Sequence, residues 1–145
     1  MIGLIQRVST AQVSVEDDIV GKIDRGILLL LGIEKDDTEQ HAIKLFERVV
    51  SYRIFADQAG KMNCDLRQVG GQLLVVSQFT LVADTNKGRR PSFSSAASPQ
   101  KGEDMYQYFL QLVAQSGLTW ASGRFGADMQ VALVNDGPVT FSLRV

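Results

Sequence analysis

The sequence predicts a layered α/β domain in which a mixed sheet system carries two helices packed on one side. Two kinds of apolar pattern lead to this prediction. Short strand-like runs recur along the chain, and two longer segments repeat apolar residues at helical spacing. A chain of 145 residues with 45% hydrophobic content has the size of one domain, so we expect a single unit over residues 1–145.

The strand-like runs are short, and turn residues separate them. Residues 11–16 alternate between apolar and polar side chains, as in a half-buried strand, and runs at 19–23 and 26–33 follow. The unbroken apolar run at 28–31 favours a strand that is covered on both faces. Further strands are expected at 53–55, 73–81, 118–123, 129–135 and 139–145. With one more strand before the first helix, the expected order is ββββ-α-ββ-α-βββ.

The two helices have recognisable ends. The first is predicted at 38–52, where Asp37 or Thr38 can cap it. For the second helix, Ser98 is the expected cap, Pro99 occupies the first turn and Gly117 ends the helix. Each helix has one apolar face, which we expect to pack on the sheet.

Composition limits the location and the partners. No apolar run approaches the ~20 residues of a membrane span, and the start of the chain lacks the sections of a signal peptide. The one cysteine, Cys64, excludes an intrachain disulfide. These features predict a cytoplasmic protein. With a net charge of -1, binding to nucleic acid would need a local basic patch. Lys87, Arg89 and Arg90 are the candidates, although such a charge run is commonly a solvated turn.

Residues suited to acid–base or metal chemistry are scarce. The one histidine, His41, lies off the apolar arc of its helix and is expected on the helix surface, so a Ser-His-Asp triad has no base. Cys64 has no histidine near it in the sequence, which favours an inert thiol. The chain shows no zinc-ligand spacing and no glycine-rich nucleotide motif. We therefore expect neither a metal site nor a cofactor.

Two segments are less ordinary. Ser77-Gln78-Phe79-Thr80-Leu81 ends a buried apolar run, where polar residues either line a site or belong to a strand that frays into a loop. In a regular strand, Ser77 and Thr80 would face opposite sides. Asn135-Asp136-Gly137-Pro138-Val139-Thr140 joins two patterned strands, and its default structure is a hairpin turn with a trans bond before Pro138.

Taken together, these two segments resemble the signature motifs of D-aminoacyl-tRNA deacylases. The similarity extends in the same order over essentially the whole chain, through Ile5-Gln6-Arg7-Val8, Gly60-Lys61-Met62-Asn63, Arg89-Arg90-Pro91-Ser92-Phe93 and Gly123-Arg124-Phe125-Gly126-Ala127-Asp128-Met129. The departures are minor. Cys64-Asp65 stands where the family more often has Leu-Ser or a similar pair.

The resemblance implies a homodimer with a three-layer α/β/β fold, mixed barrel-like sheets and sites at the subunit interface. Its implied partner is an aminoacylated tRNA, and its implied activity is hydrolysis of the ester between a D-amino acid and the terminal adenosine. Glycyl-tRNA mischarged on tRNA-Ala is an implied substrate too, and L-aminoacyl-tRNA is rejected. The family implies no cofactor and no membrane.

The resemblance also implies which residues form the site. One motif falls on the segment that lines the adenosine and the scissile ester, and the other falls on a cis Gly-Pro peptide inserted into the partner's site. The implied catalytic residues are Ser77, Gln78, Phe79 and Thr80, and the implied substrate-binding residues are Gly137, Pro138 and Met129.

An editor of many D-amino acids has to recognise their shared atoms. Backbone carbonyls of a cis Gly137–Pro138 peptide can accept hydrogen bonds from the α-ammonium, and an L side chain would collide with that turn. Because the sequence shows no protein base, we expect the adenosine 2′-OH to assist the reaction. Backbone N–H groups near Ser77 and Phe79 would hold the oxyanion, and Thr80 would form no acyl-enzyme.

Two other classes of function stay open at this stage. One is a hydrolase of other small D-amino-acid derivatives, which would need no RNA contacts. The other is a non-catalytic RNA-binding or dimer-scaffold protein.

Overall fold

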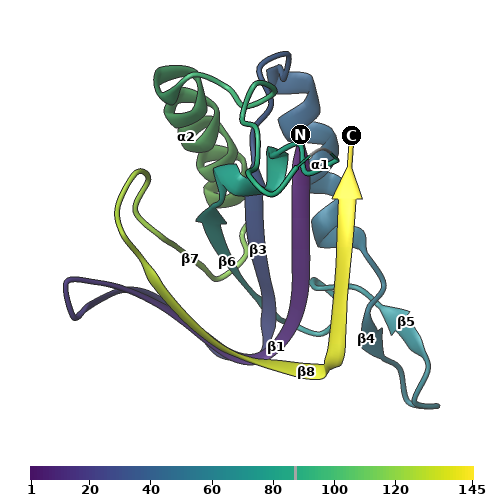
Figure 1. The fold of residues 1–145 in the computed structure, drawn as a ribbon. Coiled ribbons are helices and arrows are strands. Elements are labelled where there is room, and N and C mark those ends of the chain that lie inside the picture. The colour runs from purple at the N-terminus through teal and green to yellow at the C-terminus, as the bar shows by residue number, and fades with distance from the viewer. Residues whose placement is uncertain (87) are drawn as a thin grey trace.

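The computed structural model describes residues 1–86 and 88–145. In chain order, the elements are β1 (Ile2–Val15), β2 (Asp18–Ile23), β3 (Gly26–Gly32), α1 (Glu39–Ser51), β4 (Phe55–Ala56), β5 (Met62–Cys64), β6 (Gln72–Ser77), the 3-10 helix η1 (Phe79–Val82), α2 (Pro99–Gln115), β7 (Trp120–Ser122) and β8 (Gln130–Arg144) (Figure 1). The predicted α/β class and its two main helices are confirmed. Among the described residues, no helix combines the length and the hydropathy that crossing a membrane requires.

One six-stranded sheet forms the centre of the molecule, with the order β2-β1-β3-β6-β7 and with β8 paired to β1. β6 runs parallel to β3 and β7, while β1 is antiparallel to β2, β3 and β8, so the sheet is mixed as predicted. The sheet curls until β2 approaches β7. A Cβ on Gly21 would come within 2.6 Å of the Ser122 carbonyl oxygen, so this contact requires glycine. The result is a nearly closed barrel (Figure 1).

The two faces of the sheet pack into two hydrophobic cores. β3 shows the division, because its side chains alternate between them. Ile27, Leu29 and Leu31 belong to the larger core with α1 and α2, whereas Leu28 and Leu30 belong to the smaller core inside the barrel. The prediction of a strand covered on both faces is therefore confirmed, as is the packing of both helices on one side of the sheet (Figure 1).

The predicted hairpin turn at 135–140 is wrong. β8 is one long strand, and both of its halves pair antiparallel with β1 rather than with each other. Residues 136–139 bulge out between the halves, opposite Arg7 alone. An alternating pattern interrupted by Asp-Gly-Pro fits a hairpin and a bulged strand equally well. Only a partner as long as β1 decides between them, and that partner is distant in the sequence.

Two other strand predictions need correction. β1 already begins at Ile2, so three strands rather than four precede α1. β6 ends at Ser77 and does not extend to residue 81, because its partner β3 ends at Gly32 and offers no further ladder. The chain instead turns into η1. The short strands β4 and β5 form a separate two-stranded sheet.

The two helices begin with different caps. At α2, Ser98 Oγ accepts a hydrogen bond from the Lys101 N–H at 3.3 Å, as expected of an N-cap serine. At α1, the N-cap is Thr38, whose backbone N–H donates to Nδ1 of His41 at 3.0 Å. Asp37, the alternative cap, has a different role.

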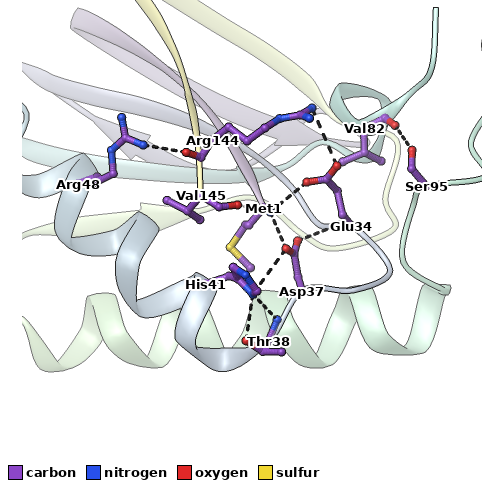
Figure 2. A network of polar contacts seen from close by, with 10 residues as sticks. All are labelled: Met1, Glu34, Asp37, Thr38, His41, Arg48, Val82, Ser95, Arg144 and Val145. Carbon is purple, nitrogen blue, oxygen red and sulfur yellow. Dashed lines mark hydrogen bonds and ion pairs between the residues drawn. The ribbon is translucent and has the colours of Figure 1, made fainter.

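Asp37 anchors the start of β1. Its carboxylate accepts hydrogen bonds from the Met1 ammonium at 2.5 Å and from the Glu34 N–H at 2.7 Å (Figure 2). The Glu34 carboxylate lies 3.1 Å from the same ammonium. The Asp37 side chain is only 5% exposed. This buried charge pair ties the first strand to the loop that leads into α1.

Replacing Asp37 should destabilise the fold. We expect Asp37→Ala to lower the free energy of unfolding by about 3 kcal/mol, because a buried ammonium would lose its closest carboxylate. Urea denaturation followed by circular dichroism measures the change. Asp36→Ala is the matched control, since Asp36 is exposed and should change stability by less than about 0.5 kcal/mol. Equal stability of the two variants would contradict this role of the ion pair.

Candidate functional site

A cavity of about 460 Å³ opens at the carboxyl end of β6. The ends of β3 and β6, the loop that enters α2, and the loop between β7 and β8 form its walls. The lining residues are Leu31, Ile33, Val76, Ser77, Gln78, Phe79, Ala96, Ala97, Ser98, Pro99, Gly102, Phe125, Gly126, Ala127, Met129 and Val131.

No ionisable side chain lines this cavity within the described part of the chain. Its polar side chains are Ser77, Gln78 and Ser98, and the rest of the wall is apolar. Such a wall can bind an apolar ring and orient it through a few polar groups. It offers no general base, since neither a serine nor a glutamine titrates near neutral pH. The polar groups that this wall offers are backbone groups, two hydroxyls and one amide.

The cavity contains only part of the predicted site. Ser77, Gln78, Phe79 and Met129 lie together in its wall. In the described structure, Thr80, Gly137 and Pro138 are not among the lining residues. The sequence analysis missed the other walls, although the 123–129 stretch was one of those similar to the family.

The end of β6 determines how the signature segment faces the cavity. The Gln78 N–H donates to the Leu31 carbonyl at 2.8 Å, which is the last link to β3. η1 then turns the chain, so that Phe79 is 62% exposed and its N–H has no protein acceptor in the described residues. Thr80 is exposed too, and its Oγ1 accepts from Gln78 Nε2 at 2.6 Å. The expected strand geometry, with Ser77 and Thr80 on opposite faces, therefore does not apply.

Tyr106 of α2 supports the cavity, although the sequence analysis did not single it out. Its hydroxyl donates to the Val75 carbonyl at 3.0 Å and lies 3.3 Å from the Gly123 carbonyl. Its ring lies 5.8 Å from that of Phe125, which lines the cavity. Burial raises the pKa of Tyr106 to about 12, so the hydroxyl remains a donor at neutral pH. The sequence signal that could have indicated Tyr106 is its place on the apolar face of a helix, where a buried hydroxyl needs a polar partner.

Arg7 holds the bulge of β8 in place. Its Nε lies 3.0 Å from the Asp136 carboxylate and donates to the Asp136 carbonyl at 3.2 Å, while Nη1 donates to the Ile54 carbonyl at 2.6 Å. The Arg7 side chain is only 14% exposed. The peptide bond between Gly137 and Pro138 is cis, the geometry that the family resemblance implied.

Further contacts stiffen the bulge from within. Asn135 accepts the Val139 N–H at 3.1 Å and donates to Thr140 Oγ1 at 2.8 Å. Gly137 has a φ of 126°, and a Cβ there would come within 2.7 Å of the Val139 side chain. Any other residue would therefore be strained. The bulge presents Gly137 and Pro138, both exposed, in one fixed conformation.

The other chemically interesting residues lie away from the cavity. His41 is on the surface of α1 with 37% of its side chain exposed. Its Nδ1 accepts a hydrogen bond from the Thr38 N–H at the start of the helix. Cys64 on β5 is partly buried and does not line the cavity. Arg89 and Arg90 are exposed in the loop before α2, and Lys87 lies outside the described residues.

Solved structures place the fold in a known class. A structure described as c-Myc DNA Unwinding Element Binding Protein has a TM-score of 0.95 and 35% identity, covering 100% of this chain and 99% of that chain. A structural analysis of a probable eukaryotic D-amino acid tRNA deacylase gives a TM-score of 0.80 at 17% identity, with 98% of each chain covered. The second likeness concerns the fold alone. The molecule thus has the barrel-like α/β domain that these proteins share.

Sequence relatives identify the family. The family model described as D-Tyr-tRNA(Tyr) deacylase matches residues 4–144. Proteins named D-aminoacyl-tRNA deacylase are 64% identical in Pseudoalteromonas atlantica and 60% identical in Shewanella frigidimarina, each over 100% of both sequences. The chain belongs to the D-Tyr-tRNA(Tyr) deacylase family, as its two motifs indicated.

Removing the Tyr106 hydroxyl should loosen the cavity wall. We expect Tyr106→Phe to lower the free energy of unfolding by about 1–2 kcal/mol, since the buried hydrogen bond from the hydroxyl to the Val75 carbonyl is lost. The pKa of about 12 lies above the ordinary value of 10.0. The unfolded chain therefore ionises first as the pH rises, and the native protein loses stability between these values. That loss should be smaller in the variant.

Denaturant titrations at neutral pH and in the alkaline range test this prediction. Tyr108→Phe is the matched control on the same helix, because Tyr108 is only partly buried and its hydroxyl makes no hydrogen bond within the described residues. If both variants lose the same stability, the Tyr106 hydroxyl has no special role.

Proposed function

We propose that this protein is an editing esterase that removes D-amino acids from wrongly charged tRNA. The ester between the amino acid and the ribose of the terminal adenosine is hydrolysed, which releases the free D-amino acid and the tRNA. The observation that carries the proposal is the family match over residues 4–144, with Ser77, Gln78 and Phe79 lining the cavity. Such an editor would work in the cytoplasm, where its substrates are made.

The cavity suits a terminal adenosine. Its volume of about 460 Å³ lies within the range of sites for small ligands. Phe125 and Met129 offer apolar surfaces to the base, and Ser77 and Gln78 offer polar groups to the ribose and the ester. Water would be largely excluded from such a wall, which strengthens the hydrogen bonds that remain.

A second copy of the chain would complete the site. Gly137 and Pro138 are exposed and rigidly held, yet they do not line the cavity of their own chain. β8 pairs with β1 alone, so its other edge has no partner among the described residues. A free edge of this length is a natural contact for another chain. In the proposed homodimer, the bulge of one chain enters the cavity of its partner.

This arrangement would account for chiral selection. Carbonyl groups of the Gly137–Pro138 bulge would accept hydrogen bonds from the α-ammonium, which all amino acids share. The side chain of an L-amino acid would point at the bulge and collide with it, whereas that of a D-amino acid would point away. Glycine has no side chain to collide, so glycyl-tRNA mischarged on tRNA-Ala would be a substrate as well.

The substrate itself would supply the missing catalytic group. Because the cavity wall has no ionisable side chain, the adenosine 2′-OH is the group best placed to orient or activate the attacking water. The Phe79 N–H, which has no protein acceptor in the described residues, and the Ser77 N–H would stabilise the developing oxyanion. Thr80 is exposed outside the cavity and is unsuited to be a nucleophile.

Contacts with the tRNA backbone would come from a local basic patch. Arg89 and Arg90 are exposed in the loop beside the cavity, and Lys87 precedes them in the sequence. With a net charge of -1 for the whole chain, phosphate binding has to rely on such a patch.

Turnover of several tRNA esters tests this function. D-Tyr-, D-Asp- and glycyl-tRNA should all be hydrolysed. L-Tyr-tRNA should react at least about 100-fold more slowly, since its side chain meets the bulge. A free D-tyrosine ester serves as control. Faster hydrolysis of that ester than of the tRNA would favour a hydrolase of small D-amino-acid derivatives. Binding of tRNA without any turnover would favour a scaffold.

The chemical mechanism is tested by removing one hydroxyl at a time. A D-aminoacyl-tRNA that ends in 2′-deoxyadenosine, charged on its 3′-OH, should react at least about 100-fold more slowly at saturating substrate. Thr80→Ala should retain turnover within about tenfold, whereas loss of a true nucleophile costs several orders of magnitude. His41→Ala and Cys64→Ala are controls away from the cavity. Normal turnover of the deoxy substrate with an inactive Thr80→Ala would mean a protein nucleophile instead.

A further inference from the structure

Two aromatic rings lie exposed at the rim of the cavity. Phe79 is 62% exposed and Phe93 is 39% exposed. Their ring centroids are 5.1 Å apart, with an angle of 49° between the ring planes. Adjacent rings that remain in contact with water mark a place where a flat apolar group can bind.

The two rings continue the cavity outwards. Phe79 belongs to the cavity wall itself. Phe93 adjoins the cavity wall as well, since its carbonyl accepts the N–H of Ala96 at 3.0 Å and Ala96 lines the cavity. A ligand that fills the cavity and extends beyond it would therefore pass over this aromatic pair. We infer that Phe79 and Phe93 form a stacking platform for the nucleotide that precedes the terminal adenosine, an inference that rests on the proposed function.

The segments that carry the rings are tied together before any ligand binds. The backbones of Asp84 and Ser92 pair through two hydrogen bonds of 2.8 and 3.0 Å. Ser95 Oγ donates to the Val82 carbonyl at 2.6 Å and so joins the loop to η1 (Figure 2). A platform that is already ordered costs less conformational entropy when a base binds.

Size and charge indicate a nucleotide as the occupant. A cavity of about 460 Å³ has room for one nucleoside, so the next nucleotide has to lie outside it. Arg89 and Arg90 are exposed in the loop that the Asp84–Ser92 pair closes, where they can meet phosphates. Asp84 is the acidic residue at the base of this loop, and its carboxylate already accepts hydrogen bonds from Asn86 at 2.9 and 2.8 Å. Stacking contacts the face of a base, so the platform needs no side chain that hydrogen-bonds to the base edge.

The test compares two substrates that differ only in the nucleotides before the adenosine. One is a D-aminoacyl ester of the trinucleotide cytidine-cytidine-adenosine, and the other is the same ester of adenosine alone. We expect Phe93→Leu to lower kcat/KM for the trinucleotide ester about tenfold, the loss of one stacked base. The adenosine ester should be hydrolysed at the unchanged rate. Phe93→Trp should restore the trinucleotide rate, because it keeps a flat ring.

A second measurement does not depend on turnover. The ring protons of the cytidine in an uncharged cytidine-adenosine dinucleotide should shift upfield in NMR spectra when the dinucleotide binds, and the shift should disappear with Phe93→Leu. Ile19→Ala is the control, because Ile19 is 57% exposed on β2 and is not among the residues that line the cavity in the described structure. It should leave both rates and the NMR shift unchanged.

Three results obtained with a protein that is active before substitution would overturn the platform. Equal loss on both esters would mean that Phe93 shapes the cavity, and no loss on either would mean that the ring is unused. Dissociation of the dimer on gel filtration of Phe93→Leu would assign the ring to an interface between copies. If the unmodified protein hydrolyses neither ester nor D-aminoacyl-tRNA, the proposed function is wrong and the platform falls with it. In the first three cases, the unmodified protein still hydrolyses its substrates and the proposed function stands.

Discussion

The backbone of β1 is the constraint on which the rest of the structure depends. This strand pairs with β3 and then with β2 along one edge, and with β8 along the other. One continuous ladder therefore fixes the positions of three neighbours at once. Its side chains contribute to both hydrophobic cores, as Ile5 and Val13 illustrate. The charge pair between Met1 and Asp37 holds the beginning of the same strand.

Local sequence patterns predicted the elements but not their partners. The run at 28–31 was correctly assigned to a doubly covered strand, and Ser98 was correctly assigned as a cap, because both depend on neighbouring residues alone. The predictions of a hairpin at 135–140 and of a strand reaching residue 81 were wrong for the opposite reason. Each is decided by the length of a strand that is remote in the sequence.

The same division holds for the site. Motif resemblance located Ser77, Gln78, Phe79 and Met129, and the structure brings these four into one cavity. It did not indicate Tyr106, which supports the cavity through the Val75 and Gly123 carbonyls and through the ring of Phe125. The search for a protein base found no candidate, and the cavity wall has no ionisable side chain among its described residues.

The continuity of β8 has a genetic consequence. Its first half begins beside the cavity at Val131, and the same strand then carries the bulge with Gly137 and Pro138. In the proposed homodimer, one polypeptide would thus contribute the wall of one active centre and the selective turn of the other. A cell that makes two defective alleles, one damaged in the cavity and one in the bulge, would assemble mixed dimers with one intact centre. In that dimer, complementation between such alleles would follow from the path of a single strand.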